Sequence, residues 1–368
     1  MEELFRFADA LGPAKIVHIH VPGAGLRAIV VVDNLACGPA LGGVRMAPDV
    51  SVEECFRLAR AMTLKNAAAG LPHGGGKSVI FGDPRMPAMA KENLIRAFAV
   101  AIRGITEYIP GPDMGTDEGC MAWVHDEIGR AAGLPQALGG IPLDAIGATG
   151  FGLAVAIEAA RAQCHLELSG ARVAVQGFGA VGQHAARFLA EKGTVLVAAA
   201  DSSATLLDPK GLDIAALIRH KEAGGALADY PGGEKLARDA IIDVACEIWI
   251  PAARPDVLRA DNVGRLTAKI VAQGANIPAT AEAERILHER GILVLPDFIA
   301  NAGGVICGAV EYHGGTEATA FAAIAEKIGR NTSEMLAEMA RTKMLPREAA
   351  VQLAERRLKE AAAARRWR

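Results

Sequence analysis

Lys65-Asn-Ala-Ala-Ala-Gly-Leu-Pro-His-Gly-Gly-Gly-Lys77-Ser78 is the stretch that decides how the rest of the chain is interpreted. One lysine ends a predicted helix, and the second, Lys77, follows three glycines directly. Because glycine has no Cβ, its backbone can approach a ligand closely, and we expect a small molecule to lie over this segment. Apolar neighbours at 67–71 and a second nearby cation would lower the pKa of a lysine. The stretch therefore predicts an amine that acts as a base near neutral pH.

Two other interpretations of this stretch do not make Lys77 a base. The phosphate loop of nucleotide hydrolases has four residues between its two glycines, whereas five residues separate Gly70 from Gly76 here. The segment before Gly70 also has helical rather than strand periodicity, so a phosphate loop is not expected. A tight glycine turn that carries a solvated Lys77 stays open on this stretch alone.

The length and composition predict a soluble enzyme of two domains. The chain has 368 residues, which exceeds the size at which one hydrophobic core usually stops growing. Its residues are 51% apolar and its formal net charge is -3, so electrostatics gives no reason to expect nucleic acid or a membrane as partner. The first residues lack the pattern of a signal peptide, and no apolar run approaches the roughly 20 residues of a membrane span. We expect a cytoplasmic location.

The six cysteines are scattered and form no C-x-x-C pair. A disulfide framework and a zinc site are therefore both unexpected, and no other metal-ligand pattern is present in the sequence. The cysteines are most simply small buried residues in a reducing compartment. They are Cys37, Cys55, Cys120, Cys164, Cys246 and Cys307.

The region before Lys65 predicts strands, a turn and a helix. Residues 16–33 contain plausible strands, and a glycine-rich turn is predicted at 38–46. Ser51 with Glu54 three residues later is a capping box, which begins a helix that reaches Lys65. Lys65 lies on an otherwise apolar flank of that helix, where a lysine is commonly a snorkelling side chain. Its role stays open on this pattern alone.

Asp113 stands between proline and glycine in the segment 108–116. An aspartate in such a context is by default a turn residue. The alternative is a carboxylate held rigidly at the lip of a cleft.

Residues 172–190 predict a strand, a glycine turn and a helix, with Gly177, Gly179 and Gly182 in the spacing G-x-G-x-x-G. The first glycine makes the turn, the second admits a pyrophosphate, and the third lets the helix pack on the strand. The helix N-terminus supplies amides and positive dipole to the phosphates. The intervening Phe178, Ala180 and Val181 belong to the same loop. A parallel sheet that binds nothing is the alternative.

Asp201 ends the next predicted strand, 19 residues beyond Gly182. An acid at this position can accept both ribose hydroxyls of NAD and repel the extra phosphate of NADP. We therefore expect NAD, although the hydroxyl of Ser202 could tolerate NADP. Three further strand-to-loop units place small or amide side chains where open sheets bind ligands, namely Ala252 and Ala253, Asn276, and Asn301.

Taken together, these motifs resemble the glutamate/leucine/phenylalanine/valine dehydrogenase superfamily, and in particular its leucine and phenylalanine members. The resemblance spans residues 38 to about 312. It rests on Gly-Gly-Val-Arg-Met, Met-Thr-Leu-Lys65-Asn-Ala, Gly-Gly-Gly-Lys77, Gly-Pro-Asp113-Met-Gly-Thr, Ala-Thr149-Gly, the dinucleotide loop, Gly-Ala-Asn276 and Asn301-Ala-Gly-Gly.

The resemblance implies an α/β fold of two domains separated by a cleft. Residues 1–140, completed by C-terminal helices at about 325–368, would form the substrate-binding and oligomerisation domain. Residues 141–324 would form the NAD-binding Rossmann domain. The implied assembly is a homo-oligomer, and the implied partners are an amino acid or 2-oxo acid and ammonium, with no nucleic acid or membrane.

The resemblance also implies roles for individual residues. Lys65 would bind the substrate α-carboxylate, Lys77 would activate the water that attacks the iminium carbon, and Asp113 would move protons to and from the amino group. Thr149, Asn276 and Asn301 would lie near the nicotinamide amide or the substrate. The implied reaction is the reversible oxidative deamination of an L-amino acid.

Two positions favour an apolar substrate. The glutamate members of the family carry a lysine directly before the glycine pair that matches Gly42-Gly43, and here that residue is Leu41. They also carry a serine seven residues after the asparagine that matches Asn301, and here that residue is Gly308. Both changes would leave a distal carboxylate unpaired. The predicted side-chain pocket is lined by Leu41, Gly111, Val305 and Gly308. Gly42, Gly43 and Asn276 are further predicted substrate-binding residues.

Two alternatives stay open. Stretches such as Asp-Pro-Lys-Gly-Leu-Asp-Ile, which follows Asp201, look more like the glutamate members, so a glutamate dehydrogenase with a cation from elsewhere is the alternative enzyme. A non-catalytic NAD-binding regulator is the alternative of another class.

Overall fold

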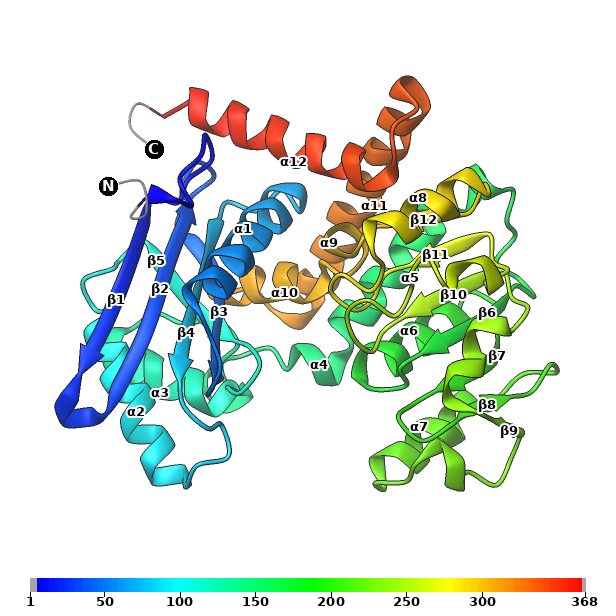
Figure 1. Ribbon diagram of the computed structural model, residues 1–368. Helices are drawn as coiled ribbons and strands as arrows, with labels where there is room; N and C mark the ends of the chain where they lie inside the picture. The colour runs from blue at the N-terminus through cyan, green and yellow to red at the C-terminus, as the bar shows by residue number, and fades with distance from the viewer. Residues whose placement is uncertain (1–4, 366–368) are drawn as a thin grey trace. The chain divides into compact units, whose positions relative to one another are not determined.

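A computed structural model describes residues 5–365 and divides the chain into two compact units (Figure 1). Of these residues, unit 1 contains 5–142, 305–320 and 351–365, and unit 2 contains 143–304 and 321–350. Each unit has its own sheet. The first division lies after residue 142, and the predicted one lies after residue 140. Residues 305–320, predicted for the NAD-binding domain, group with unit 1, and residues 325–350, predicted for the first domain, group with unit 2.

Unit 1 is built on a mixed sheet of five strands in the order β1-β2-β4-β3-β5. β2 pairs antiparallel with both β1 and β4. β3 pairs parallel with both β4 and β5. β4 is therefore an interior strand. The strands are β1 Lys15–Val21, β2 Leu26–Asn34, β3 Ala40–Ala47, β4 Gly74–Phe81 and β5 Tyr108–Pro112.

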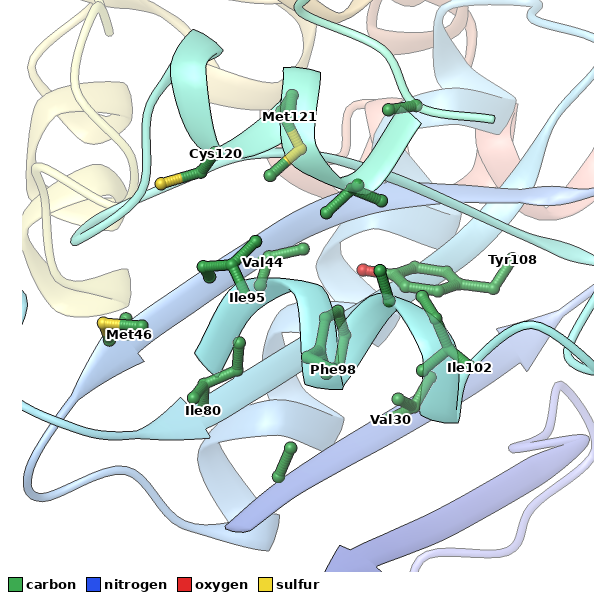
Figure 2. Packing of buried hydrophobic residues seen from close by; sticks show 14 of the residues in the cluster. Val30, Val44, Met46, Ile80, Ile95, Phe98, Ile102, Tyr108, Cys120 and Met121 are labelled. Atoms are coloured by element: carbon green, nitrogen blue, oxygen red, sulfur yellow. The ribbon is translucent and has the colours of Figure 1, made fainter. Parts of the chain in front are cut away.

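Helices cover both faces of this sheet. Alternate residues of β2 face opposite ways, so Val30 packs with α2 and α3 while Val31 packs with α1. Figure 2 shows the first of these cores, where Phe98 of α2 and Met121 of α3 lie over the strands. The other face carries α1. The helices are α1 Val52–Ala68, α2 Ala88–Ala101 and α3 Glu118–Ile128.

One segment predicted as a glycine turn, and a second for which a glycine turn stayed open, are both strands. Residues 38–46 contribute most of β3, and the three glycines before Lys77 begin β4. The reason is close packing: a Cβ on Gly42 would lie 1.7 Å from the carbonyl oxygen of Gly76, and one on Gly75 would lie 2.1 Å from the amide nitrogen of Thr63. Glycine here lets neighbouring backbones touch, which strand propensity alone cannot indicate.

Unit 2 is built on a sheet of seven strands in the order β12-β11-β10-β6-β7-β8-β9. β6, β7, β10, β11 and β12 are parallel, and β8 and β9 form an antiparallel edge. The strand order reverses beside β6, which lies between β7 and β10. The strands are β6 Arg172–Gln176, β7 Val195–Ala200, β8 Thr205–Leu207, β9 Glu234–Leu236, β10 Ile248–Pro251, β11 Ile270–Ala272 and β12 Leu293–Leu295.

The helices of unit 2 include a long apolar one. By length and composition the run Leu143–Cys164 could cross a membrane, which differs from the expectation that no apolar run approaches that length. More than half of its most apolar window is buried in the protein, as in a core helix. The helices of unit 2 are α4 Leu143–Ile146, α5 Ala148–Ala160, α6 Ala180–Ala190, α7 Ile214–Glu222, α8 Ala281–Glu289 and α9 Asp297–Ala300.

Three C-terminal helices are divided between the units. Each of them begins in one unit and continues in the other. They are α10 Gly303–Tyr312, α11 Glu317–Thr342 and α12 Pro346–Ala363.

Candidate active site

The face of the unit 1 sheet that packs on α1 carries the predicted polar residues. Val44 and Ser78 are register partners on β3 and β4, so Gly43 and Lys77, one residue earlier, lie side by side on the opposite face. Gly43 is also the register partner of Gly111 on β5. These strands thereby bring Lys77 next to the end of β5, where Asp113 follows.

Lys77 and Asp113 form an ion pair. The Lys77 Nζ lies 2.6 Å from the Asp113 Oδ2. The lysine side chain is 7% exposed and the aspartate side chain 22% exposed, so the amine is the more buried partner. The structure thus brings together two residues that are 36 positions apart in the sequence.

Arg45 is a second cation on the same carboxylate, and it is not among the predicted site residues. Its Nε donates to the Asp113 Oδ2 at 3.1 Å, and its Nη1 donates to the Glu54 Oε1 at 2.6 Å. Ser51 caps α1 as predicted, accepting from the Glu54 amide at 3.1 Å. The Glu54 carboxylate holds Arg45 in place. Strand alternation was the available signal, because Arg45 lies two residues beyond Gly43 and on the same face.

The pKa of Asp113 is lowered from its ordinary value. Burial alone would raise it, but the positive charge of Lys77, the hydrogen bond from that lysine and the charge of Arg45 outweigh burial. The carboxylate is therefore ionised and held between two cations.

Gly43 leaves the space in which this pair fits. A Cβ at that position would lie 2.7 Å from the Asp113 Cβ and 3.0 Å from the Lys77 Nζ. Any larger residue would displace one partner. The second glycine of the predicted pocket pair thus serves the ion pair.

The backbone around Asp113 is also fixed. The Asp113 amide donates to the Thr116 Oγ1 at 3.0 Å, and that hydroxyl donates to the Val44 carbonyl at 2.7 Å. The turn is thereby tied to β3, which carries Gly43 and Arg45. Asp113 is both a turn residue and a member of a charged cluster.

Lys65 lies in the last turn of α1 and is partly buried. The next residue, Asn66, donates through its Nδ2 to the carbonyls of Leu41, at 3.1 Å, and Gly74, at 2.7 Å. These bonds fix the end of α1 against β3 and β4. Lys65 is therefore placed by the same two strands that carry Gly43 and Lys77.

The predicted side-chain pocket contains two glycines with space beside them. Gly308 on α10 is buried, yet a Cβ there would meet nothing within 4 Å. A Cβ on Gly111 would meet only the Ala132 carbonyl oxygen, at 3.7 Å. Leu41 is 4% exposed and Val305 partly exposed. All four residues belong to unit 1.

The three glycines of the unit 2 loop have three different environments. Gly177 has φ +99°, and its Cβ would lie 2.7 Å from the Ala253 amide nitrogen. A Cβ on Gly182 would lie 2.1 Å from the Gly177 carbonyl oxygen, whereas one on Gly179 would meet nothing within 4 Å. Turn, helix packing and open approach are the properties of a dinucleotide loop. The residues present therefore fit a dinucleotide.

A pocket of about 390 Å³ lies at the carboxyl ends of β6, β7 and β10. This is where the strand order reverses and where open α/β sheets bind ligands. The Gln176 Oε1 is a buried atom without a partner among the described residues. The pocket is lined by Gln176, Gly177, Phe178, Gly179, Ala200, Asp201, Ser202, Lys221, Arg238, Ala252, Ala253 and Arg254. Ala180 and Val181 begin α6 directly after it.

Thr149, Asn276 and Asn301 all belong to unit 2. The Asn301 Nδ2 donates to the Asn276 Oδ1 at 3.0 Å and to the Gly274 carbonyl at 3.2 Å. The next residue, Ile277, has φ +49°, which is strained for a β-branched residue. Backbone strain of this kind is common near functional sites. Thr149 lies in the first turn of α5.

The part of the chain that the structure describes contains no metal-ligand group and no disulfide. Within residues 5–365 no group of three or more His, Cys, Asp or Glu side chains could hold a metal ion. The six cysteines are free, and four of them are buried.

Known families match almost the whole chain. Residues 139–366 match the family described as Glutamate/Leucine/Phenylalanine/Valine dehydrogenase. Residues 13–130 match the family described as Glu/Leu/Phe/Val dehydrogenase, dimerisation domain.

Individual proteins agree with this match. The chain is 38% identical over 322 residues to a glutamate dehydrogenase of Aeropyrum pernix, covering 82% of this chain and 77% of the relative. It is similar to the hetero-hexameric glutamate dehydrogenase from Thermus thermophilus in its Leu-bound form, with TM-score 0.85, 31% identity and coverage of 97% and 91%. It is also similar to L-tryptophan dehydrogenase from Nostoc punctiforme, with TM-score 0.76, 25% identity and coverage of 98% of both chains.

The sequence resemblance, the two-unit α/β fold and these matches lead to one assignment. The chain belongs to the Glutamate/Leucine/Phenylalanine/Valine dehydrogenase family and is an NAD(P)-dependent amino-acid dehydrogenase.

Proposed function

We propose that Lys77 and Asp113 carry the chemistry of a reversible oxidative deamination of an L-amino acid. The observation that carries this proposal is the buried ion pair of 2.6 Å beneath Gly43, with Arg45 as a second cation. In the reaction, the amino acid, NAD(P)⁺ and water give a 2-oxo acid, NAD(P)H, ammonium and a proton. A non-catalytic regulator would have no need of a buried amine placed against a carboxylate.

Asp113 and Lys77 have complementary tasks in this scheme. The substrate ammonium must lose a proton before its α-carbon can give up a hydride, and Asp113, the more exposed member of the pair, accepts it. Once Asp113 is protonated, the Lys77 ammonium releases a proton to solvent, which is the proton product of the reaction. The neutral Lys77 amine then takes a proton from the water that attacks the iminium carbon. Asp113 finally returns a proton to the leaving ammonia. Lys65 is a point cation suited to the substrate α-carboxylate.

The nicotinamide coenzyme, when bound, accepts the hydride. The Gly177–Gly182 loop and the N-terminus of α6 would hold its pyrophosphate, because Gly179 leaves open space there and helix amides attract phosphate. Asn301 and Asn276 hold each other in a strained turn, which would fix the amide groups toward the nicotinamide or the substrate.

The names of the relatives favour glutamate as the substrate. The Aeropyrum pernix and Thermus thermophilus proteins are both called glutamate dehydrogenases. We therefore give L-glutamate and 2-oxoglutarate the first place. Because residue 41 is leucine, a cation other than residue 41 must then bind the distal carboxylate.

An apolar L-amino acid of the leucine, valine or phenylalanine type is the second candidate, and a specific observation favours it. Leu41 is buried where the glutamate members carry a lysine, and Gly308 and Gly111 leave space beside it. A carboxylate without a partner in such a pocket would be strongly disfavoured. The tryptophan dehydrogenase similarity is consistent with a large side chain.

The deciding experiment is NADH and NADPH oxidation with ammonium and three 2-oxo acids in parallel: 2-oxoglutarate, 4-methyl-2-oxopentanoate and phenylpyruvate. Highest kcat/KM with 2-oxoglutarate supports the first candidate. Highest kcat/KM with either other acid supports the second, and the ratio of those two reports the depth of the pocket. Absence of turnover with all three 2-oxo acids would contradict the proposed chemistry.

The family match bears on the assembly of the protein, and the cysteines bear on its location. Residues 13–130 match a dimerisation domain, so we propose that the protein forms a homo-oligomer. Free cysteines are typical of a reducing compartment, and we propose a cytoplasmic location. Size-exclusion chromatography with light scattering would test the assembly.

A further inference from the structure

The coenzyme pocket contains an acid whose hydrogen-bonding capacity is already used. The Asp201 Oδ1 accepts from the Ser203 amide at 2.8 Å and from the Ser203 hydroxyl, and more weakly from the Ala204 amide at 3.3 Å. The Oδ2 accepts from the Lys221 Nζ at 2.7 Å and from the Leu227 amide at 3.0 Å. A carboxylate has about four lone-pair sites. Asp201 therefore has little capacity left for two ribose hydroxyls.

The charge of Asp201 is also compensated. Its side chain is 10% exposed, whereas that of Lys221 is 22% exposed, so the cation is the more accessible partner. A preference for NAD over NADP would need a free Asp201 carboxylate that repels the 2′-phosphate. In the folded protein Lys221 cancels that repulsion at its source.

Two further cations line the same pocket. Arg238 and Arg254 line the same pocket as Asp201 and Lys221, which gives three cations against one carboxylate. Arg238 lies beside the strand that follows Asp201, because the Thr205 Oγ1 donates to the Arg238 carbonyl at 2.7 Å. Its ion pair with Asp239 is solvent-exposed and weak enough to rearrange.

We propose that Lys221, with Arg238 and the hydroxyl of Ser202, binds the 2′-phosphate of NADP, so that this site accepts NADP⁺ as well as NAD⁺. Asp201 is then a positioning residue that holds Lys221 in place. This proposal rests on the dinucleotide site of the proposed function. It concerns the adenosine end of the coenzyme and leaves the amino-acid chemistry unchanged.

The test is calorimetric binding of NAD⁺ and NADP⁺ to the whole protein without amino acid. We expect the two Kd values of the wild-type protein to lie within about tenfold of each other. In Lys221→Met the carboxylate loses its cation, so the ratio of the NADP⁺ Kd to the NAD⁺ Kd should rise by roughly 30-fold or more. Lys210→Met, which removes the same charge from an exposed turn, should leave that ratio unchanged.

Two results would overturn the proposal. One is wild-type binding of NADP⁺ that is more than about 100-fold weaker than that of NAD⁺. The other is an unchanged ratio in Lys221→Met. If that variant does not fold, the wild-type protein is titrated with adenosine 2′,5′-bisphosphate and with 5′-AMP; weaker binding of the bisphosphate contradicts the proposal, and equal or tighter binding supports it.

The readout is independent of turnover. A protein that binds both coenzymes but deaminates no amino acid would contradict the proposed function alone. A protein that turns over with NAD⁺ and does not bind NADP⁺ would contradict the Lys221 proposal alone.

Discussion

Two aspartate–lysine pairs of nearly equal length lie in the two units, and their surroundings give them different properties. Lys77 and Asp113 are 2.6 Å apart, and Lys221 and Asp201 are 2.7 Å apart. In unit 1 the amine is the more buried partner, and in unit 2 the carboxylate is. The first pair presents a carboxylate to solvent, and the second presents a cation.

This difference explains why two similar pairs suit different tasks. Asp113 is accessible and lies between two cations, so it can exchange a proton with a substrate. Asp201 accepts hydrogen bonds from its own turn and from Lys221. The role proposed for it is therefore to orient Lys221. The donors around an acid, rather than its position after a strand, decide its role.

Loss of Lys77 should have the largest effect. Lys77→Met removes the amine that activates water, and kcat should fall by roughly 10³- to 10⁴-fold. Binding of NAD(P)⁺, measured by calorimetry, should persist because the coenzyme pocket lies in unit 2. Lys359→Met on α12, whose side chain is 77% exposed, is the matched control. Unchanged turnover in the Lys77 variant would remove the role given to this lysine.

A single methyl group beside the pair should have the next largest effect. In Gly43→Ala the new Cβ would lie 2.7 Å from the Asp113 Cβ, so the pair must move apart. Misplacement on this scale should lower kcat by about 10²-fold. Gly104→Ala, whose Cβ meets nothing within 4 Å, is the control. Wild-type kcat in a folded Gly43→Ala protein would show that the close pair is not needed.

A charge at residue 41 should shift specificity. In Leu41→Lys the new ammonium can pair with a distal carboxylate, and the preference for 2-oxoglutarate over 4-methyl-2-oxopentanoate should rise by tenfold or more. Leu41→Met keeps the pocket apolar and should leave the preference unchanged. If the wild-type protein already uses glutamate through another cation, the lysine will bring no gain, which would support the first substrate candidate.

The smallest effect concerns stability in acid. Because the folded-state pKa of Asp113 is lowered, its contribution to stability is present above its ordinary pKa of 3.8 and is lost as pH falls through the lower folded value. Asp113→Asn should therefore lose less stability than the wild-type protein between about pH 5 and about pH 2. Denaturant titrations over that pH range measure the difference. Equal losses in both proteins would mean that Asp113 does not contribute to acid sensitivity.

Much of the fold could be predicted from local patterns. The strand, turn and helix around Gly177 were predicted because their spacing is local and each glycine has a distinct steric role. A turn stayed open for the three glycines before Lys77 because glycine favours turns, while the contacts that make them a strand come from α1 and β3. Such contacts join distant residues and leave no local periodicity.

The candidate site shows the same division. Lys77 and Asp113 were found through family motifs, and the structure adds their contact. Arg45 was missed because its partners, Glu54 on α1 and Asp113 after β5, come next to it only in the folded chain. The contact between Asp201 and Lys221 was missed because Lys221 lies 20 residues further along the chain, near the end of α7.

The central claim is that Lys77 and Asp113 work as one proton-handling unit, and a double-mutant cycle tests it most directly. The measurement is kcat for Lys77→Met, Asp113→Asn and the double variant, with NAD(P)⁺ binding as a check on folding. Residues that act as a unit are strongly non-additive, so we predict that the double variant loses no more activity than the worse single variant. Losses that multiply in the double variant would contradict the account.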